Sequence, residues 1–332
     1  MHRSCYNLFK GVIRMYPLLL KPAVKEYVWG GNRLKTEFSF DCNSDIVAEG
    51  WMLSCHPDGP SVVINGQYAG MTLPEVVERF GEQAIGKHAA AFPYFPLLIK
   101  LIDAKQSLSV QVHPDDEYAL AHEGEFGKTE MWYVVDCDPG AELIYGFKEP
   151  ITKESFKQHI EQNTLTDICN SVPVHKGDVF FIAAGTLHAI GGGILIAEVQ
   201  QNSNSTYRVF DFGRVGADGK PRPLHIEKAL DVTLRDKPSH PYGAVGDITA
   251  LGSNTVRTLA RCNLFSADLL SLREPFSIHN NNSFVSLVCL DGSARLSYDN
   301  ANFPIQKGDS VFIPAGLPAT INGTANFLYS YV

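Results

Sequence analysis

The sequence predicts a mainly β protein of two domains, with a few short helices on its surface. Its 332 residues include 45% hydrophobic and 19% charged side chains, with 28 Gly and 19 Pro, a composition typical of a globular chain with a large buried core. Most of the chain reads as apolar runs of roughly four to eight residues separated by Gly, Pro, Asn and Asp, the rhythm of a sandwich or barrel. At roughly 150 residues per domain, the length suits two domains.

Individual elements follow from local signals. Residues 61–64, 130–135 and 283–290 are β-rich apolar runs and predict strands. Four other segments show helical spacing and start signals, such as a proline in the first turn. We expect these helices to lie on the surface of the β core, at residues 72–80, 115–122, 152–162 and 225–234.

A turn-rich segment at residues 235–246, containing DKPSHPYG, has the Pro and Gly content of an interdomain connection. We therefore predict a metal-binding catalytic domain at 15–237 and a smaller C-terminal domain at 238–332. Residues 1–14 are basic and carry neither a long apolar segment nor a small-residue cleavage site, so we expect a poorly ordered extension rather than a secretory signal. Translation from Met15 is the alternative to translation from Met1.

An internal repeat links the two predicted domains. GDVFFIAAGTLHAI at 177–190 returns as GDSVFIPAGLPATI at 308–321, with the same Gly, Asp, Phe, Ile, Ala, Gly and Ile. A glycine turn, a strand, a second glycine turn and another strand predict a hairpin corner of a small barrel; a generic turn repeat within one sandwich is the alternative. His188 in the first copy corresponds to Ala319 in the second. We therefore expect the chemistry in the N-terminal domain and a metal-free C-terminal domain.

Charge and cysteine content exclude several function classes. The 28 Lys and Arg against 36 Asp and Glu give a formal charge of −8, which disfavours a nucleic-acid partner. The 7 cysteines are scattered and form no C-x-x-C pair, so neither a disulfide framework nor a thiolate zinc site is expected. No apolar stretch approaches the roughly 18 residues of a membrane span. We expect a cytoplasmic protein with neither nucleic acid nor membrane as a partner; the oligomeric state stays open.

The densest polar group lies in SLSVQVHPDD at 107–116. In a strand through this segment, period-two alternation places Ser109, Gln111 and His113 on one face and two valines on the other. Glu130 begins the next β run and His188 ends the predicted corner, so these side chains are expected to converge inside a barrel. Two imidazoles, a carboxylate and an amide oxygen suit a borderline divalent ion, zinc first, with iron and manganese as alternatives. The predicted metal ligands are Gln111, His113, Glu130 and His188.

The remaining histidines have simpler explanations. His56 and His175 lie in predicted turns, where hydrogen bonds to the local backbone account for them, and His122 lies at a predicted helix end. A single histidine on a β face is more often a satisfied core or surface residue than a ligand. This interpretation applies to His2, His159, His240 and His279.

A second polar cluster, EVQQNSNSTYRVFDFGR, occupies residues 198–214 and contains amides and hydroxyls where a barrel strand would ordinarily alternate. Arg208 either points into the barrel, where it would hold an anionic substrate or a developing oxyanion, or is a solvated arginine on an edge strand. The residues alone leave these two interpretations balanced.

These motifs resemble the type I mannose-6-phosphate isomerases, in the short bacterial form with two cupin domains. The resemblance runs through most of the chain from about Tyr16 and implies two cupin-type β-barrel (jelly-roll) domains. It rests on VWGG at 28–31, AEGWMLSCHPDG at 48–59, FPLLIKLIDA at 95–104, LSVQVHPDD at 108–116, GKTEMWYV at 127–134, and the segments at 176–190 and 199–214.

The resemblance implies one zinc ion at the same four ligands and a phosphorylated hexose as the substrate. It also implies that Lys100, Ser109 and Lys128 contact the sugar phosphate and that Arg208 is the catalytic arginine. Lys128 precedes Glu130 by two residues and would alternate to the same side of the strand, so it either binds phosphate or relays a proton.

The implied reaction interconverts mannose 6-phosphate and fructose 6-phosphate by moving a proton between C2 and C1 through a cis-enediol, with the metal as a Lewis acid. The base stays open among a metal-bound water, Lys128 and a further carboxylate. Two positions depart from the family pattern: Asn204, where relatives often have Asp, and Ala183, which replaces a Pro of the cupin corner.

Two other function classes remain as alternatives. One is a metal-dependent cupin oxygenase or epimerase acting on another small molecule, because similar ligand sets hold redox-active iron. The other is a non-catalytic phosphosugar-binding cupin that retains a structural metal, for which Asn204 gives modest support.

Overall fold

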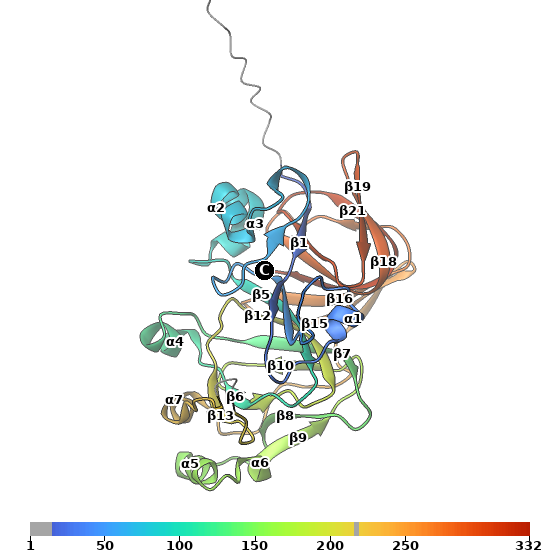
Figure 1. Cartoon of the computed structure of the whole chain (residues 1–332). Coiled ribbons are helices and arrows are strands. Elements are labelled where there is room, and N and C mark those ends of the chain that lie inside the picture. The colour runs from blue at the N-terminus through green and yellow to red at the C-terminus, as the bar shows by residue number, and fades with distance from the viewer. Residues whose placement is uncertain (1–14, 216–218) are drawn as a thin grey trace, which may run out of the picture.

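The computed structural model describes residues 15–215 and 219–332, and the predicted extension at 1–14 lies outside these residues. The described chain is mainly β, as predicted, and every strand pairing that it contains is antiparallel. The strands form three sheets. Figure 1 shows four helices along one side of the lower half, namely α4 (Asp116–His122), α5 (Lys153–Glu161), α6 (Leu165–Ile168) and α7 (Ile226–Val232).

Two sheets come from the N-terminal two thirds of the chain. The six-stranded sheet contains, in spatial order, β10 (Val179–Ile182), β7 (Glu130–Cys137), β12 (Ile194–Gln201), β5 (Leu97–Ala104), β3 (Glu49–Leu53) and β2 (Ala23–Lys25). The five-stranded sheet contains β13 (Tyr207–Phe210), β6 (Val110–Val112), β11 (His188–Ala189), β8 (Glu142–Phe147) and β9 (Cys169–Pro173).

The third sheet has ten strands and contains the whole C-terminal part. Its main path is β14 (Ile248–Leu251), β15 (Asn254–Arg261), β16 (Ser266–Leu272), β21 (Ala319–Tyr331), β18 (Val285–Tyr298), β20 (Ser310–Ile313), β1 (Leu18–Lys21) and β4 (Val62–Val63). Off this path, β17 (Phe276–Ile278) pairs with β21, and β19 (Ala301–Gln306) pairs with β18.

Two early strands join this C-terminal sheet. In β1, Leu18 is the register partner of Phe312 in β20, and Leu20 of β1 is the partner of Val63 in β4. Figure 1 shows β1, in blue, beside the red and orange strands of the C-terminal part. The predicted domain boundary between residues 237 and 238 stays a prediction. Because of these pairings, two strands that precede this boundary complete the sheet of the C-terminal part.

Four of the seven helices in the described ranges are the predicted ones, within two residues at each end. Three of them have caps that match the sequence signals: Thr72 and Glu75 form a capping box, Asp115 accepts a hydrogen bond from the Tyr118 backbone amide, and Thr152 caps the helix at 153–161. The sequence interpretation missed α3, which is broken at Gly86, and two single-turn helices. The helices are α1 (Arg33–Thr36), α2 (Leu73–Phe80), α3 (Glu82–Ala90), α4 (Asp116–His122), α5 (Lys153–Glu161), α6 (Leu165–Ile168) and α7 (Ile226–Val232), with a 3-10 turn η1 (Gly66–Tyr68).

The six-stranded sheet is covered on both faces. All eight residues of β5 and all eight of β12 are buried, and their side chains alternate between two cores. Leu101 packs in a core shared with Phe312 and Leu328 of the ten-stranded sheet, whereas Ile102 packs in a core shared with Tyr145 of the five-stranded sheet. Polar residues of β5 and β12 that point to the same side as Ile102 therefore face the five-stranded sheet. The candidate site lies in the space between these two sheets.

The two repeated segments have the predicted turns. Gly177 and Gly308 have φ values of 93° and 95°, and the second glycines of the two copies, Gly185 and Gly316, also have positive φ. The prediction of a hairpin is wrong for both copies. In the second copy β20 and β21 both pair with β18, which lies between them. In the first copy β10 pairs with β7, whereas β11 pairs with β6 and β8. The corner carries the chain from one sheet to the other and places His188 between them.

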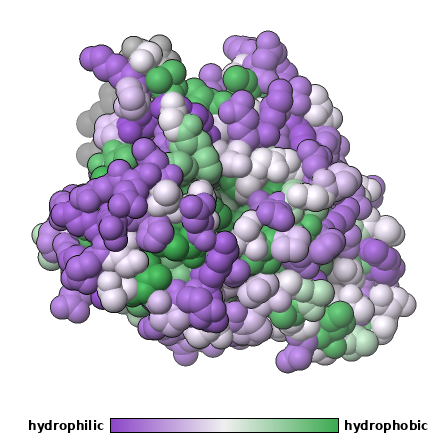
Figure 2. Space-filling model, turned by 90° about the horizontal axis from the view of Figure 1, so that it is seen from below, coloured by the Kyte–Doolittle hydropathy of each residue, from purple (hydrophilic) through white to green (hydrophobic). Residues whose placement is uncertain are grey.

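No helix within the described residues is long and apolar enough to cross a membrane. The face at the lower end of the molecule is covered mainly by hydrophilic residues, with smaller hydrophobic areas between them (Figure 2).

Candidate metal centre and pocket

The predicted ligands come together from both N-terminal sheets. Gln111 is the middle residue of β6 and the register partner of His188 at the start of β11, so both belong to the five-stranded sheet. His113 follows β6 directly. Glu130 is the first residue of β7 in the facing sheet and shares the face of Trp132, which packs in the core between the sheets. Period-two alternation thus places all four side chains in the space between two sheets.

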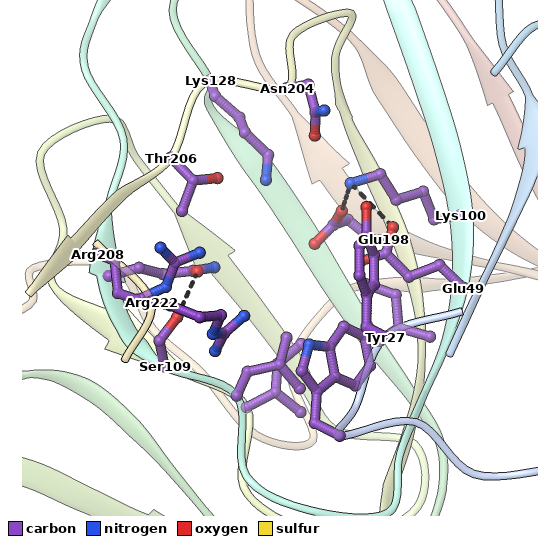
Figure 3. A pocket seen from close by; sticks show the side chains of 15 residues that line it. Tyr27, Glu49, Lys100, Ser109, Lys128, Glu198, Asn204, Thr206, Arg208 and Arg222 are labelled. Atoms are coloured by element: carbon purple, nitrogen blue, oxygen red, sulfur yellow. Dashed lines mark hydrogen bonds and ion pairs between the residues drawn. The ribbon is translucent and has the colours of Figure 1, made fainter. Parts of the chain in front are cut away.

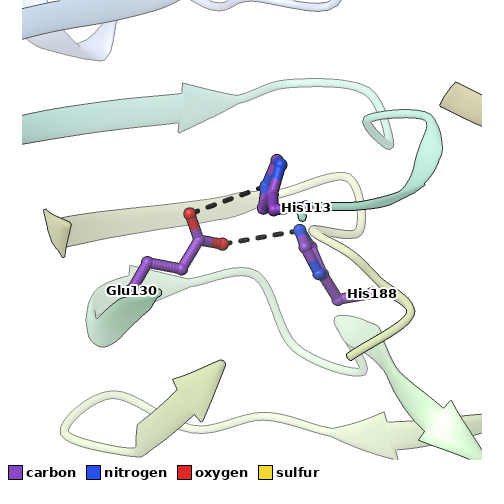
Figure 4. A group of neighbouring side chains, drawn as sticks. All are labelled: His113, Glu130 and His188. Carbon is purple, nitrogen blue, oxygen red and sulfur yellow. Dashed lines mark ion pairs between the residues drawn. The ribbon is translucent and has the colours of Figure 1, made fainter. Parts of the chain in front are cut away.

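The distances define a compact cluster, shown in Figure 4. The Glu130 carboxylate lies between the two imidazoles, with Oε1 3.4 Å from His188 Nε2 and Oε2 3.7 Å from His113 Nε2. The ligand atoms of these three residues all lie within 4.8 Å of one another, and all three residues are buried. The Gln111 amide nitrogen lies 3.4 Å from His188 Nε2.

Both histidines are held by their other ring nitrogen. His113 Nδ1 lies 2.8 Å from the Ser205 carbonyl oxygen, and His188 Nδ1 lies 2.8 Å from the Thr186 carbonyl oxygen. A carbonyl only accepts, so each Nδ1 carries the proton and donates it. Each Nε2 is then unprotonated and faces Glu130 with its lone pair, which is the arrangement that metal-binding histidines use.

Unsatisfied polar atoms indicate that the cluster is built for a cation. Glu130 Oε1 and Oε2 are both buried without a hydrogen-bond partner among the described residues, and only Oε2 has a cation nearby, the Lys128 ammonium at 3.1 Å. Buried carboxylate oxygens in this condition are costly unless a cation satisfies them. Gln111 presents its amide nitrogen to His188 and must turn its amide by about 180° to offer Oε1 as a ligand.

Burial sets the protonation of the cluster. It lowers the pKa of His188 to about 4 and that of His113 well below its ordinary value, so both rings are neutral at neutral pH. Burial, with the nearby charge of Glu198, raises the pKa of Glu130 to about 8. A bound divalent cation would instead favour the deprotonated form of Glu130, because a carboxylate binds metal in that form.

A pocket of about 290 Å³ opens beside the cluster. It contains the predicted substrate residues, and Figure 3 shows their side chains directed into it from both sheets. Its wall is rich in charged groups and also includes aromatic and aliphatic side chains. The lining residues are Tyr27, Trp29, Glu49, Lys100, Ile102, Leu108, Ser109, Gln111, Lys128, Ile190, Glu198, Asn204, Thr206, Arg208 and Arg222.

One side of the pocket is a buried ionic network around Lys100. The Lys100 ammonium lies 3.2 Å from Glu198 Oε1 and 3.9 Å from Glu49 Oε2. Each carboxylate also accepts an indole N–H, Glu49 from Trp51 at 2.7 Å and Glu198 from Trp132 at 2.8 Å. Burial lowers the pKa of Lys100, but the two carboxylates outweigh this effect and raise it overall. Lys100 is therefore a fixed positive charge held between two carboxylates.

Lys128 lies between this network and the metal cluster. Its ammonium is 3.1 Å from Glu130 Oε2 and 3.2 Å from His113 Nε2, and the residue is 5% exposed. On the opposite wall, the Ser109 hydroxyl donates a hydrogen bond of 3.4 Å to Gln111 Oε1. Lys128 is thus the cation nearest to the candidate ligands.

Arg208 and Arg222 lie next to each other at the other end of the pocket (Figure 3). Arg208 Nη1 donates to the Pro223 carbonyl at 2.9 Å, while its buried Nε finds no acceptor among the described residues. Arg222 is bound by Asp211, with Nε 2.7 Å from Oδ2. Burial and the charge of Arg222 lower the pKa of Arg208. This wall presents an uncompensated guanidinium to the pocket.

The structure therefore gathers every predicted site residue into one region and adds residues that the sequence interpretation did not single out. Glu198 lies within the polar cluster noticed at 198–214, and a carboxylate in the buried run ILIAEVQQ was a usable signal. Glu49 and Tyr27 carried no comparable signal. Arg222 lies in an irregular segment, and only its contact with Asp211 places it in the pocket wall.

A buried His–Glu–His cluster between antiparallel sheets, beside a charged pocket, defines a β protein with a candidate metal centre. Residues 18–135 match the family described as phosphomannose isomerase type I, catalytic domain, and residues 255–332 match mannose-6-phosphate isomerase, cupin domain. The mannose-6-phosphate isomerase of Streptococcus mutans is 39% identical over 298 residues, which cover 90% of this chain and 92% of that protein. The chain belongs to the type I mannose-6-phosphate isomerase family and is an isomerase of cupin fold.

Further comparisons agree. Mannose-6-phosphate isomerase ManA of Bacillus subtilis is 40% identical over 306 residues, covering 91% of this chain and 94% of that protein. The crystal structure of the mannose 6-phosphate isomerase from Bacillus subtilis matches with a TM-score of 0.87 at 35% identity, over 96% of this chain and all of that chain. A putative mannosephosphate isomerase from Archaeoglobus fulgidus matches at 22% identity with a TM-score of 0.76, over 97% of this chain and 98% of that chain, which is a likeness of fold.

Proposed function

We propose that the protein interconverts mannose 6-phosphate and fructose 6-phosphate, with one zinc ion held by Gln111, His113, Glu130 and His188. The observation that carries this proposal is the buried His–Glu–His cluster beside the charged pocket, in a chain whose relatives are named for this activity. Zinc would act as a Lewis acid that polarises the substrate carbonyl.

The donor set supports zinc over harder ions. Two neutral imidazoles, a carboxylate and an amide oxygen are borderline ligands, which suit zinc better than magnesium or calcium. The hydrogen bonds from each Nδ1 to a backbone carbonyl fix the orientation of both rings before any ion arrives.

The charged walls would bind and orient the sugar phosphate. Ser109, Lys100 and Lys128 are the predicted contacts, and Arg208 with Arg222 adds two guanidinium groups at the far end. Lys100 is already compensated by two carboxylates, and Arg222 is paired with Asp211. We therefore assign the stronger pull on an anionic group to Arg208. Arg208 would then bind either the negative charge that develops on the substrate during the reaction or the phosphate group of the substrate.

Proton transfer between C2 and C1 needs a group that accepts and returns a proton at one face of the substrate. We propose Lys128 for this role, accepting the proton as the neutral amine and returning it as the ammonium, since its Nζ lies beside the metal cluster and its side chain is almost fully buried. Glu198 Oε1 is the alternative carboxylate, because it lines the same pocket.

The decisive experiment combines metal analysis with an isomerisation assay. We expect the purified protein to carry about one zinc per chain and His113→Ala to lose both zinc and turnover, while His122→Ala, at an exposed helix end, keeps both. Undiminished turnover in His113→Ala would refute the assignment. Exchange of the C2 proton with solvent separates the isomerase from a binding protein, and activity without oxygen separates it from an oxygenase.

We further propose that the protein acts in the cytoplasm, without nucleic-acid or membrane partners. The six cysteines in the described part of the chain are free thiols, which suits a reducing compartment, and the formal charge of −8 opposes binding to nucleic acid.

A further inference from the structure

A short turn at the edge of the pocket holds one candidate ligand in place. Residues 202–206 connect β12 with β13, and within them the Ser205 carbonyl accepts the hydrogen bond from His113 Nδ1. The same turn contributes Asn204 and Thr206 to the pocket wall. The position of this turn therefore decides both the direction of the His113 ring and the shape of one wall.

The outer side of this turn converges on a single carboxylate. Glu125, in the loop between α4 and β7, receives three donors on Oε2: the Ser203 hydroxyl at 3.3 Å, the Asn204 amide N–H at 3.2 Å and the Ser205 hydroxyl at 3.3 Å. Three donors from consecutive residues on one oxygen hold the turn closed around that oxygen. The glutamate itself does not line the pocket.

A buried histidine also lies beside Glu125. His56 Nδ1 accepts the backbone N–H of Asp58 at 3.1 Å, so the ring carries its proton on Nε2, which lies 3.4 Å from Glu125 Oε1. His56 is 3% exposed. Glu125 is therefore held on one side by the segment after β3 and on the other by the turn after β12.

The turn is also held by two shorter hydrogen bonds that do not involve Glu125. The Gln200 amide donates to the Ser203 carbonyl at 2.7 Å, and the Asn204 side chain donates to Asp58 at 2.8 Å. Neither contact reaches Ser205. The Ser205 hydroxyl, whose residue carries the carbonyl that His113 needs, is anchored by Glu125.

We propose that Glu125 is a positioning residue for the metal ligand His113, acting through the turn at 203–205. This inference rests on the proposed metal site. When the carboxylate is removed, three donors lose their common acceptor, the turn gains freedom, and the Ser205 carbonyl no longer fixes the His113 ring. Outer partners of metal-binding histidines typically change metal affinity by about 10- to 100-fold.

The test compares zinc affinity in two carboxylate variants. Glu125→Gln keeps the shape of the side chain but loses the charge and replaces one acceptor oxygen by a donor. Glu123→Gln is the matched control, because Glu123 lies two residues away and binds Tyr207 and Lys228 instead of the turn. Zinc affinity is measured by competition with a chromophoric chelator, and the visible absorption of the cobalt-loaded proteins reports the ligand geometry.

We expect Glu125→Gln to bind zinc about tenfold or more weakly, with an altered cobalt spectrum and unchanged circular dichroism, while Glu123→Gln stays within about twofold of the wild type. Ser205→Ala, which removes one donor and keeps the carbonyl, is expected to fall between them and serves if Glu125→Gln fails to fold. Wild-type affinity and spectrum in the folded Glu125 variant, or in Ser205→Ala if it is needed, would overturn the inference. A wild-type protein that binds no zinc would overturn the proposed function as well.

Discussion

Arg208 and Arg222 place two like charges at one end of the pocket, and among the described residues only Arg222 has a carboxylate partner there. A preorganised positive charge is most effective where negative charge develops during the reaction, because it needs no rearrangement at that moment. The lowered pKa of Arg208, caused by burial and by the neighbouring guanidinium, indicates that this charge is held at a cost in the absence of an anion.

We expect Arg208→Gln to lower kcat by about a hundredfold or more, and Arg222→Gln mainly to raise KM. Steady-state kinetics with mannose 6-phosphate separate the two effects, and Arg79→Gln on the exposed side of α2 is the control. A rise in KM alone for Arg208→Gln would reassign it to phosphate binding, and wild-type kinetics would exclude it from the site.

At the scale of elements, Glu123 joins three of them at the end of α4. It accepts hydrogen bonds from Lys228 of α7 and from the Tyr207 hydroxyl of β13, at 2.5 Å and 2.7 Å. The Lys228 ammonium, with the Tyr207 hydroxyl, lowers the pKa of the Glu123 carboxyl below its ordinary value of 4.5. This carboxylate therefore stabilises the fold when it is ionised.

The sign of the pH dependence follows from the lowered pKa. The contribution of Glu123 is fully present above the ordinary carboxyl pKa and is lost as the pH falls through the lower pKa of the folded state. We expect Glu123→Gln to cost about 1 kcal/mol of unfolding free energy at pH 7 and to match the wild type at strongly acidic pH. Urea unfolding at a series of pH values tests this, and a difference that does not depend on pH would contradict it.

The glycine turns of the repeat are a second feature at this scale. Gly308 has a φ of 95°, and an added Cβ would collide with the backbone carbonyl of Phe38. Gly140 has a φ of 78° but no neighbouring atom within 4 Å of an added Cβ. We expect Gly140→Ala to cost about 1–2 kcal/mol from backbone strain, and Gly308→Ala to cost about 1–3 kcal/mol more from the collision. If the two variants lost the same stability in thermal unfolding, the turn beside Phe38 would accommodate the added methyl group without a cost in free energy.

At the scale of the whole molecule, the two parts of the chain depend on one another. Leu18 and Leu101 from the N-terminal part pack in one core with Phe265, Phe312 and Leu328 from the C-terminal part. The pairing of β1 with β20 adds backbone hydrogen bonds across the same boundary.

We therefore expect a chain that ends at Lys237 to be insoluble or unfolded, because it would expose this core and leave β1 without its partner strand. Size-exclusion chromatography and circular dichroism of the truncated protein provide the measurement. A soluble, monodisperse fragment that still binds zinc would contradict this dependence.

Much of the candidate site was readable before the fold was known. Ser109, Gln111 and His113 share a face because alternation is a local property of a strand, and the repeat singled out His188 through its counterpart Ala319. Glu198 was missed because its signal, a carboxylate within a buried apolar run, does not tell a side chain that faces a pocket from one that is paired inside a core. The hairpin prediction failed because the sequence pattern of strand, turn and strand does not specify whether the two strands pair with each other or with other strands.

The local sequence determined this protein's strand pattern, four of its helices and the kinds of ligand it offers, since periodicity, caps and turns act over a few residues. Contacts between residues far apart in the chain decided the rest: that β1 completes the C-terminal sheet, that Arg222 joins the pocket, and that Glu125 reaches the turn behind His113. These depend on how three sheets pack together, because burial and pairing energies are settled only when the whole chain has folded.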